Sequence, residues 1–231
     1  MIKIFRFIKD FLKTKKTDVI LISFPKAGST WLRSVYFDYT KLYYNHNFKF
    51  DEVCPEINNK YNNINCPFPR LIKTHRTLPL FITKYKTIYL WRNHVDVLLS
   101  YSRFLLNKNH THFQSRKTFK KLFKTVCWKY NLYTKVINLT SPISYHYDEC
   151  LVSLKTVSRL ISLINNRQVD TELLIQALNK NTFNNIKKKT YLTESFKPTN
   201  KNYEFFSQSR IDMLSKKAAK KYLEMRFQNY G

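Results

Sequence analysis

The segment from Asp18 to Leu32, with the sequence DVILISFPKAGSTWL, constrains the fold of this chain more than any other stretch. It begins with an apolar run, Val19 to Ile22, of the length and composition typical of a buried strand. A tight turn follows, and an amphipathic helical pattern opens at Ser29. A strand, a turn and a helix N-terminus gather unpaired backbone N–H groups around one small space, which predicts a phosphate-binding turn.

The side chains of this turn suit the same kind of ligand. Lys26 supplies a positive charge, and Ser29 and Thr30 supply hydroxyl groups. Gly28 is the only glycine before the C-terminal Gly231, and a turn whose backbone approaches a ligand closely needs glycine there. Because Lys26 precedes Gly28, the turn lacks the G-x-x-x-x-G-K-[ST] form of nucleotide triphosphatases.

Strand patterns alternate with helical patterns along the rest of the chain. Further strands are expected at 70–75, 86–91 and 143–147, and helices at 29–40, 94–105, 115–137, 154–164, 171–178 and 207–227. This alternation is typical of the α/β class, here a single domain whose central parallel sheet is flanked by helices. We expect a basic N-terminal segment at 1–17 and the domain at 18–231.

The composition favours a folded protein with anionic partners. Of the 231 residues 43% are hydrophobic, and 41 basic against 15 acidic side chains give a formal net charge of +26. Such a charge favours nucleotides, acidic glycans, nucleic acid or membrane surfaces. An excess of solvated lysine gives the same balance, so charge alone selects no partner. The four cysteines lack C-x-x-C spacing, which argues against a zinc or redox site.

Residues 1–16 interleave isoleucine and phenylalanine with lysine and arginine at nearly helical spacing. The charges interrupt every apolar run, so we expect neither a membrane span nor a signal peptide, and hence a cytoplasmic protein. A helix packed on the domain is the favoured interpretation of this segment. Peripheral contact with a membrane surface is the alternative.

Polar residues occur where three of the predicted strands end. Lys26–Thr30 follows the first strand, Lys73–His75 ends the second, and Arg92–Ser100 follows the third. Ligands of open parallel sheets bind beyond the carboxyl ends of the strands. We therefore expect these three segments to line one crevice.

Carboxylates are scarce in this part of the chain. Between Glu56 and Asp148 the only acidic residue is Asp96. A magnesium-dependent phosphoryl transferase needs carboxylates to hold its metal, so we expect phosphate-like groups to be bound without a metal. The same scarcity predicts that Arg92 is not engaged in a surface salt bridge.

Taken in order, these motifs resemble the sulfotransferases that use 3′-phosphoadenosine 5′-phosphosulfate (PAPS). Residues 24–31, FPKAGSTW, resemble the family's 5′-phosphosulfate loop, and residues 92–100, RNHVDVLLS, resemble its 3′-phosphate motif. Lys73-Thr74-His75 is similar to the segment that carries the catalytic histidine of the cytosolic branch. Tyr147-Asp148-Glu149 and Asn181-Thr182-Phe183 are similar to two later family segments.

The resemblance implies a P-loop-like sulfotransferase fold and a role for each residue. His75 would be the general base for the acceptor hydroxyl, with Lys26 and Lys73 adding charge at the transferring group. Arg92 and Ser100 would hold the 3′-phosphate. The implied cofactor-binding residues are Lys26, Gly28, Ser29, Thr30, Trp31, Arg92, Ser100, Tyr147 and Phe183.

The chain also departs from the family pattern. The family's C-terminal Arg-Lys-Gly loop, which contacts the 3′-phosphate, has no counterpart, and Arg210 and Lys201 are the candidates to replace it. The expected acceptor is a hydroxyl or amine on a glycan or small molecule, with no specific nucleic acid as partner. Two alternatives stay open: a magnesium-dependent nucleotide kinase, and a non-enzymatic basic module that binds polyanions.

Overall fold

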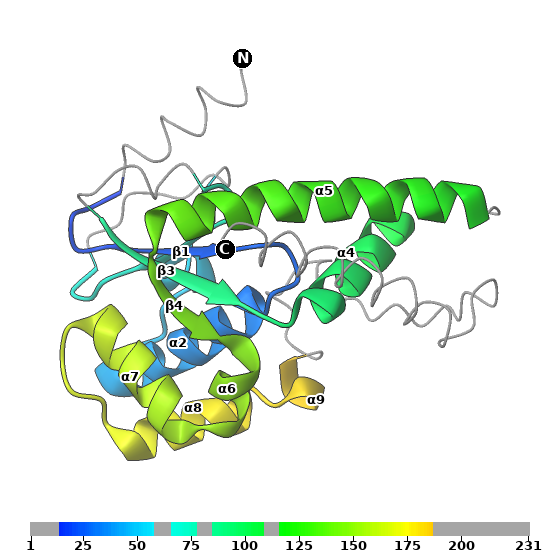
Figure 1. Ribbon diagram of the computed structural model, residues 1–231. Coiled ribbons are helices and arrows are strands. Elements are labelled where there is room, and N and C mark those ends of the chain that lie inside the picture. The colour runs from blue at the N-terminus through cyan, green and yellow to red at the C-terminus, as the bar shows by residue number, and fades with distance from the viewer. Residues whose placement is uncertain (1–13, 58–65, 78–84, 109–115, 187–231) are drawn as a thin grey trace.

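A parallel sheet of four strands forms the centre of the computed structural model, which describes residues 14–57, 66–77, 85–108 and 116–186. Its strand order is β2-β1-β3-β4 (Figure 1). The strands are β1 (Val19–Ser23), β2 (Leu71–Thr74), β3 (Lys86–Trp91) and β4 (Ile143–His146). The predicted α/β class and the parallel sheet are confirmed.

Strand β1 pairs with β2 on one side and with β3 on the other. Val19 lies opposite both Leu71 and Lys86, and the pairing with β3 continues to Ser23 opposite Leu90. Every residue of β1 is buried, as expected for a strand covered on both faces. Because all pairings are parallel, the strands end at the same edge of the sheet.

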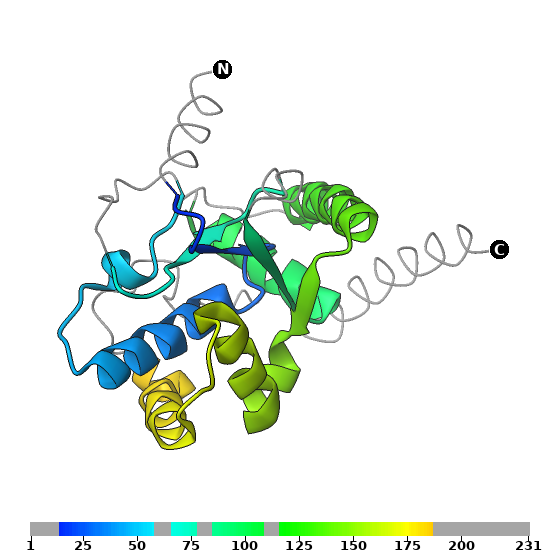
Figure 2. The ribbon, with the colours of Figure 1, turned by 90° about the vertical axis from the view of Figure 1, so that its left-hand side faces the viewer.

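Helices cover both faces of the sheet (Figures 1 and 2). On one face lie α4 (His94–Lys108) and α5 (Arg116–Thr140), and on the other lie α2 (Ser29–Tyr44), α7 (Leu154–Asn165) and α8 (Thr171–Lys180). The remaining helices are short: α3 (Phe50–Val53), α6 (Tyr147–Val152) and α9 (Phe183–Ile186).

Alternate residues of β1 belong to two separate cores, because successive side chains of a strand point to opposite faces. Ile20 and Ile22 pack with the helices α4 and α5, whereas Val19 and Leu21 pack with α2, α7 and α8. All four side chains are buried. The apolar run that predicted the strand therefore supplies both cores.

The structure differs from the sequence-based expectation in several element bounds. The helix expected at 29–40 continues to Tyr44 and ends at Asn45, whose left-handed backbone lets its N–H bond back to the last turn. The three short helices α3, α6 and α9 were not predicted. The expected helix at 207–227, with Arg210, and the segment carrying Lys201 lie outside the described residues.

The N-terminal segment is described only from Thr14 onward. The division into residues 1–17 and 18–231, and the membrane contact considered for residues 1–16, therefore stay predictions. Within the described ranges, no helix combines the length and apolar composition needed to cross a bilayer.

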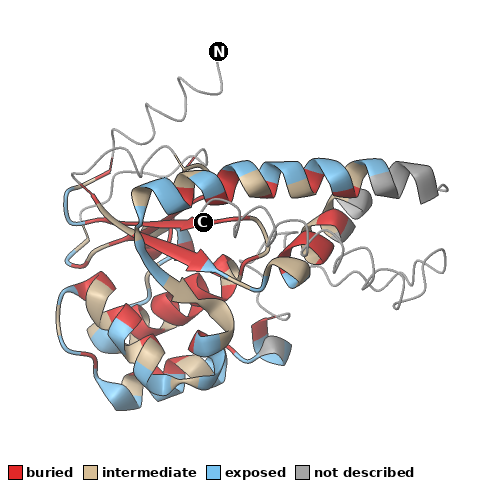
Figure 3. Ribbon diagram, in the orientation of Figure 1, coloured by how far each residue is buried: buried red, intermediate tan, exposed pale blue. Residues whose placement is uncertain are grey.

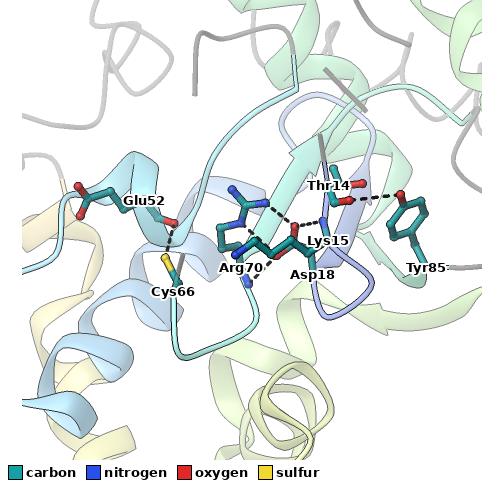
Figure 4. A network of polar contacts seen from close by, with 7 residues as sticks. All are labelled: Thr14, Lys15, Asp18, Glu52, Cys66, Arg70 and Tyr85. Carbon is teal, nitrogen blue, oxygen red and sulfur yellow. Dashed lines mark hydrogen bonds and ion pairs between the residues drawn. The ribbon is translucent and has the colours of Figure 1, made fainter. Parts of the chain in front are cut away.

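A buried ion pair joins the chain just before β1 to the chain just before β2 (Figure 4). The carboxylate of Asp18 accepts from Arg70 Nη2 at 2.6 Å and Nε at 3.0 Å, and from the backbone N–H of Lys15 at 2.7 Å. Asp18 and Arg70 are each 1% exposed. The pair fixes the start of both strands at the end of the sheet opposite their carboxyl ends.

We predict that Asp18→Ala lowers the free energy of unfolding by about 3–5 kcal/mol, because the buried Arg70 guanidinium loses the carboxylate that it binds. Urea unfolding measures the change. The paired variant Asp18→Leu/Arg70→Met removes both charges, so its free energy of unfolding is expected to fall much less than that of the single variant. A single variant as stable as the double variant would contradict this account.

Candidate functional site

The turn after β1 is built around two residues with left-handed backbone. Lys26 has φ 72° and Gly28 has φ 95°. Such a conformation is costly for lysine, and it is typical of ligand-binding sites. Helix α2 then starts at Ser29, and its N-cap residue, Gly28, has no side chain with which to cap the first N–H groups. A helix N-terminus of this kind suits a bound anion.

Gly28 is needed at this turn for two reasons, its φ and its close neighbour. A Cβ at Gly28 would lie 2.1 Å from Cδ2 of Tyr147. The sequence predicted close approach of a ligand to this glycine. In the structure the approaching group is the ring of Tyr147, from the first residue of α6.

Tyr147 connects the turn to two other parts of the site. Its ring meets Trp31 edge to face, with 5.7 Å between ring centroids. The guanidinium carbon of Arg92 lies 5.2 Å from the centroid of the same ring. Trp31 is only 6% exposed and belongs to the core. The predicted cofactor residues Gly28, Trp31, Arg92 and Tyr147 are therefore neighbours.

His75 lies just beyond β2 and bonds to the end of β1. Its Nδ1 is 2.7 Å from the carbonyl oxygen of Ser23. A carbonyl oxygen only accepts, so Nδ1 carries the proton and Nε2 of the neutral ring keeps its lone pair. Burial, followed by the charge of Lys73, lowers the pKa of His75 to about 4. The side chain is thus a neutral imidazole at pH 7, with a defined tautomer.

Lys73 is held by a carboxylate that the sequence analysis missed. Its Nζ lies 3.1 Å from Glu56 Oε2, and Arg33 Nη1 lies 3.7 Å from the same oxygen. The chain around Glu56 is fixed against β2, since Ile57 N–H donates to the Lys73 carbonyl and Lys73 N–H donates to that of Pro55. Glu56 therefore balances part of the charge of this cluster. Its position in an irregular loop left no sequence signal.

Lys26 extends toward α4, with its Nζ 4.1 Å from the centroid of the Phe104 ring. Burial, followed by the charge of Lys73, lowers the pKa of Lys26 to about 8. Burial also lowers the pKa of Lys73, against the opposing effect of Glu56. Burial is thus the main reason that the charged form of both lysines is disfavoured, and a bound anion would stabilise their ammonium groups.

Arg92 has two acidic neighbours, so the expectation that it lacks a salt bridge was wrong. Asp96 Oδ2 lies 3.4 Å from its Nη2, and Asp148 Oδ1 lies 3.6 Å from its Nε. The first turn of α4 supplies Asp96 and the start of α6 supplies Asp148. Both contacts are long and partly exposed, and Nε has no hydrogen-bond partner among the described residues. Arg92 thus keeps capacity for a ligand.

A cavity of about 250 Å³ opens beside Arg92, between β3, β4 and the carboxyl-terminal half of α5. Its lining residues are Tyr89, Trp91, Arg92, His94, Tyr130, Thr134, Ile137, Asn138 and Ser144. Of these lining residues, Arg92 alone is a predicted site residue, and neither Lys26 nor His75 lines the cavity.

For the remaining predicted residues the structure gives the position and, for all but Phe183, the burial. Ser29 is buried at the start of α2, Thr30 is half-buried beside it, and Ser100 is half-buried on α4. Phe183 begins α9, but its side chain lies outside the described set. Within that set, no group of three or more His, Cys, Asp or Glu side chains is arranged to hold a metal ion.

The arrangement combines a cationic turn, an uncapped helix N-terminus and a neutral histidine at one edge of the sheet. Cations and backbone amides stabilise an anionic group during transfer, and a neutral imidazole accepts a proton. This chemistry suits the transfer of an anionic group to a hydroxyl or amine.

Comparison with known proteins is consistent with this chemistry. The family model described as a sulfotransferase domain matches residues 16–149. Cytosolic sulfotransferase 1 of Arabidopsis thaliana is 30% identical in an alignment of 142 residues that covers 51% of this chain and 43% of that protein. The matched part thus spans less than half of that relative.

Two solved structures share the fold. Retinol dehydratase in complex with androsterone and the inactive cofactor PAP has a TM-score of 0.66 and 13% identity, covering 94% of this chain and 85% of its own. Mouse sulfotransferase SULT7A1 with PAP has a TM-score of 0.64 and 14% identity, with coverages of 94% and 88%.

The low pKa of His75 predicts a specific dependence of stability on pH. Between about pH 6.5 and about pH 4 the unfolded chain binds a proton that the folded histidine does not. Compared with His75→Asn, which keeps a donor for the Ser23 carbonyl, the wild type should therefore lose stability as pH falls through this window. Urea unfolding of both proteins measures the difference, and a difference that does not change with pH would contradict the prediction.

Proposed function

This chain belongs to the sulfotransferase-domain family, and from that premise we propose that it transfers a sulfuryl group from PAPS to an acceptor hydroxyl or amine. The observation that carries the proposal is the bond from His75 to the Ser23 carbonyl. It supports the proposal because a neutral imidazole then lies at the strand end from which the proposed phosphate-binding turn starts. A binding module would need the turn but not the base.

The residues of the chain fit a nucleotide with phosphates at two positions. Lys26, Ser29 and Thr30, with the N-terminus of α2, would hold the 5′-phosphosulfate. Burial, followed by the charge of Lys73, lowers the pKa of Lys26, and an anion bound there would stabilise the charged form of its ammonium. Arg92, with Ser100, would hold the 3′-phosphate, and its Nε lacks a hydrogen-bond partner among the described side chains.

The residues proposed for the nucleoside are Trp31, Tyr147 and Phe183, of which Trp31 is buried in the core and would act through its ring contact with Tyr147. Tyr147 lies against Gly28 and Trp31, so its ring forms a wall next to the phosphate turn. Phe183, the third member of the proposed set, is placed there by the family resemblance alone. Each of these assignments is part of the proposal.

When bound, the donor supplies a sulfuryl group whose bond to the bridging phosphate oxygen breaks as the acceptor oxygen or nitrogen bonds to sulfur. His75 Nε2 would take the acceptor's proton, while its Nδ1–H stays on the Ser23 carbonyl. Lys26 would offset the charge that develops on the phosphate.

Lys73 has a less direct part in this proposal than Lys26. Its ammonium is bonded to Glu56, so it acts mainly through the electrostatic potential at Lys26 and His75. An anion bound beside Lys73 would oppose the effect of that lysine on His75 and raise the pKa of the imidazole. The histidine would then become a better base when the donor is in place.

A small hydroxyl compound or a glycan is the proposed acceptor class. Androsterone and retinol occupy the retinol dehydratase structures that share this fold, and each is a small hydroxyl compound. A cytoplasmic location is also proposed, by analogy with the cytosolic relative. No specific observation favours the nucleotide kinase or the non-enzymatic module, and neither is proposed.

Adenosine 3′,5′-bisphosphate (PAP) is the direct probe of the two phosphate sites. At a concentration about 100 times its dissociation constant it should stabilise the protein by about 2.7 kcal/mol and raise the melting temperature by about 5–10 °C. Lys26→Ala and Arg92→Ala should remove most of this shift. Lys155→Ala and Arg159→Ala, which change exposed cations on α7, are matched controls that keep it. No shift in the wild type would overturn the proposal.

The role of His75 is tested separately from binding. His75→Asn keeps a donor for the Ser23 carbonyl but has no Nε2, so it should bind PAP normally. Its rate of labelled-sulfate transfer from PAPS, across a panel of phenols, alcohols, amines and glycans, should fall by about 10²–10⁴-fold. Transfer at the wild-type rate would exclude His75 as the base while leaving the proposed donor intact.

A further inference from the structure

Helix α5 carries an apolar stripe on the side that faces away from the sheet. Trp128, Leu132 and Leu139 are 61%, 45% and 82% exposed. At 3.6 residues per turn, the three lie within about 40° of one another around the helix axis. Figure 3 shows exposed residues along the outer side of α5, and Figure 1 shows this helix as the outermost described element on that face of the sheet.

The stripe is not needed to hold α5 in place. The opposite side of the helix already packs on the sheet through Phe123, Val126, Tyr130, Tyr133 and Ile137, all of them buried. Single exposed apolar residues are ordinary, but three in one line on a surface helix, one of them tryptophan, indicate an interaction surface.

Lysines border the stripe on both sides. Lys124 and Lys135 lie on one side of it and Lys129 lies on the other, and all three are exposed. None of them forms an ion pair with another described residue, and the sequence of α5 contains no aspartate or glutamate. The stripe and these lysines together are called the α5 outer face below.

We propose that the α5 outer face binds the surface of membranes rich in anionic lipid. A helix that lies in a membrane interface has an apolar face with tryptophan or leucine, flanked by basic residues whose charges reach the lipid headgroups. On α5 this pattern runs from Lys124 to Leu139, which is about 22 Å along the helix axis.

The charge pattern argues against two other occupants. A second copy of this face would bring unpaired lysines against lysines, which is repulsive. A soluble polyanion such as nucleic acid or heparin would use the lysines, but it would gain little from Leu132 and Leu139. An anionic bilayer uses both the charges and the apolar side chains. This inference does not depend on the proposed sulfuryl transfer.

Vesicle co-sedimentation of the full chain tests the proposal. The wild type should bind vesicles of phosphatidylcholine mixed with phosphatidylserine, and should bind pure phosphatidylcholine vesicles at least about tenfold more weakly. An apolar variant, Trp128→Ser/Leu132→Ser/Leu139→Ser, should bind the anionic vesicles about tenfold or more weakly than wild type. A charge variant, Lys124→Glu/Lys129→Glu/Lys135→Glu, should lose about 100-fold or more.

Matched controls carry the same changes on the other side of the molecule. Leu151→Ser/Val152→Ser/Ile175→Ser removes three comparably exposed apolar residues from α6 and α8. Lys155→Glu/Arg159→Glu/Lys180→Glu makes the same change in net charge on α7 and α8. Both controls should retain most of the binding. Circular dichroism and thermal melting confirm that each variant is folded.

Three results would overturn the proposal. One is failure of the wild type to bind anionic vesicles. Another is unchanged vesicle binding by both α5 variants, which would place any membrane contact elsewhere, residues 1–16 included. The third needs a parallel measurement of heparin binding. If the apolar variant keeps full vesicle binding and the charge variant loses both vesicle and heparin binding, the face is a general surface for polyanions.

Discussion

The parallel pairing of β1 with both of its neighbours is the constraint on which the site depends. The register aligns the carboxyl end of β1 with those of β2 and β3, so the turn at Lys26, the histidine after β2 and Arg92 after β3 emerge together. The hydrogen bond between His75 and Ser23 is possible only because these two strand ends are adjacent. The buried ion pair of Asp18 and Arg70 secures the opposite end of the same two strands.

Several positive side chains lie close together at the candidate site, and a carboxylate balances only part of their charge. Lys26, Lys73 and Arg33 are brought close enough to act on one another's pKa or on that of His75, and Glu56 offsets part of this charge. Like charges held this close repel one another, and a bound anion would reduce the free energy of that repulsion. The arrangement therefore explains why a buried lysine and a neutral histidine occur side by side.

Local patterns in the sequence predicted the strands and the turn between β1 and α2, because an apolar run and a Lys-x-Gly-Ser-Thr turn are contained in one short segment. Contacts between distant segments could not be predicted in the same way. Glu56 reaches Lys73 from an irregular loop, and the ring of Tyr147 lies on Gly28 from a different part of the chain. Asp96 and Asp148 were visible in the sequence, but their approach to Arg92 depends on where α4 begins and where β4 ends.

A crystal structure of the protein with adenosine 3′,5′-bisphosphate is the most direct test of the central claim. The account predicts the 5′-phosphate at the N-terminus of α2, within hydrogen-bond distance of Lys26 Nζ, and the 3′-phosphate on the guanidinium of Arg92. His75 should keep its bond to the Ser23 carbonyl, with Nε2 facing the space next to the 5′-phosphate. A bisphosphate bound elsewhere on the molecule, with Lys26 and Arg92 not in contact with it, would contradict the account.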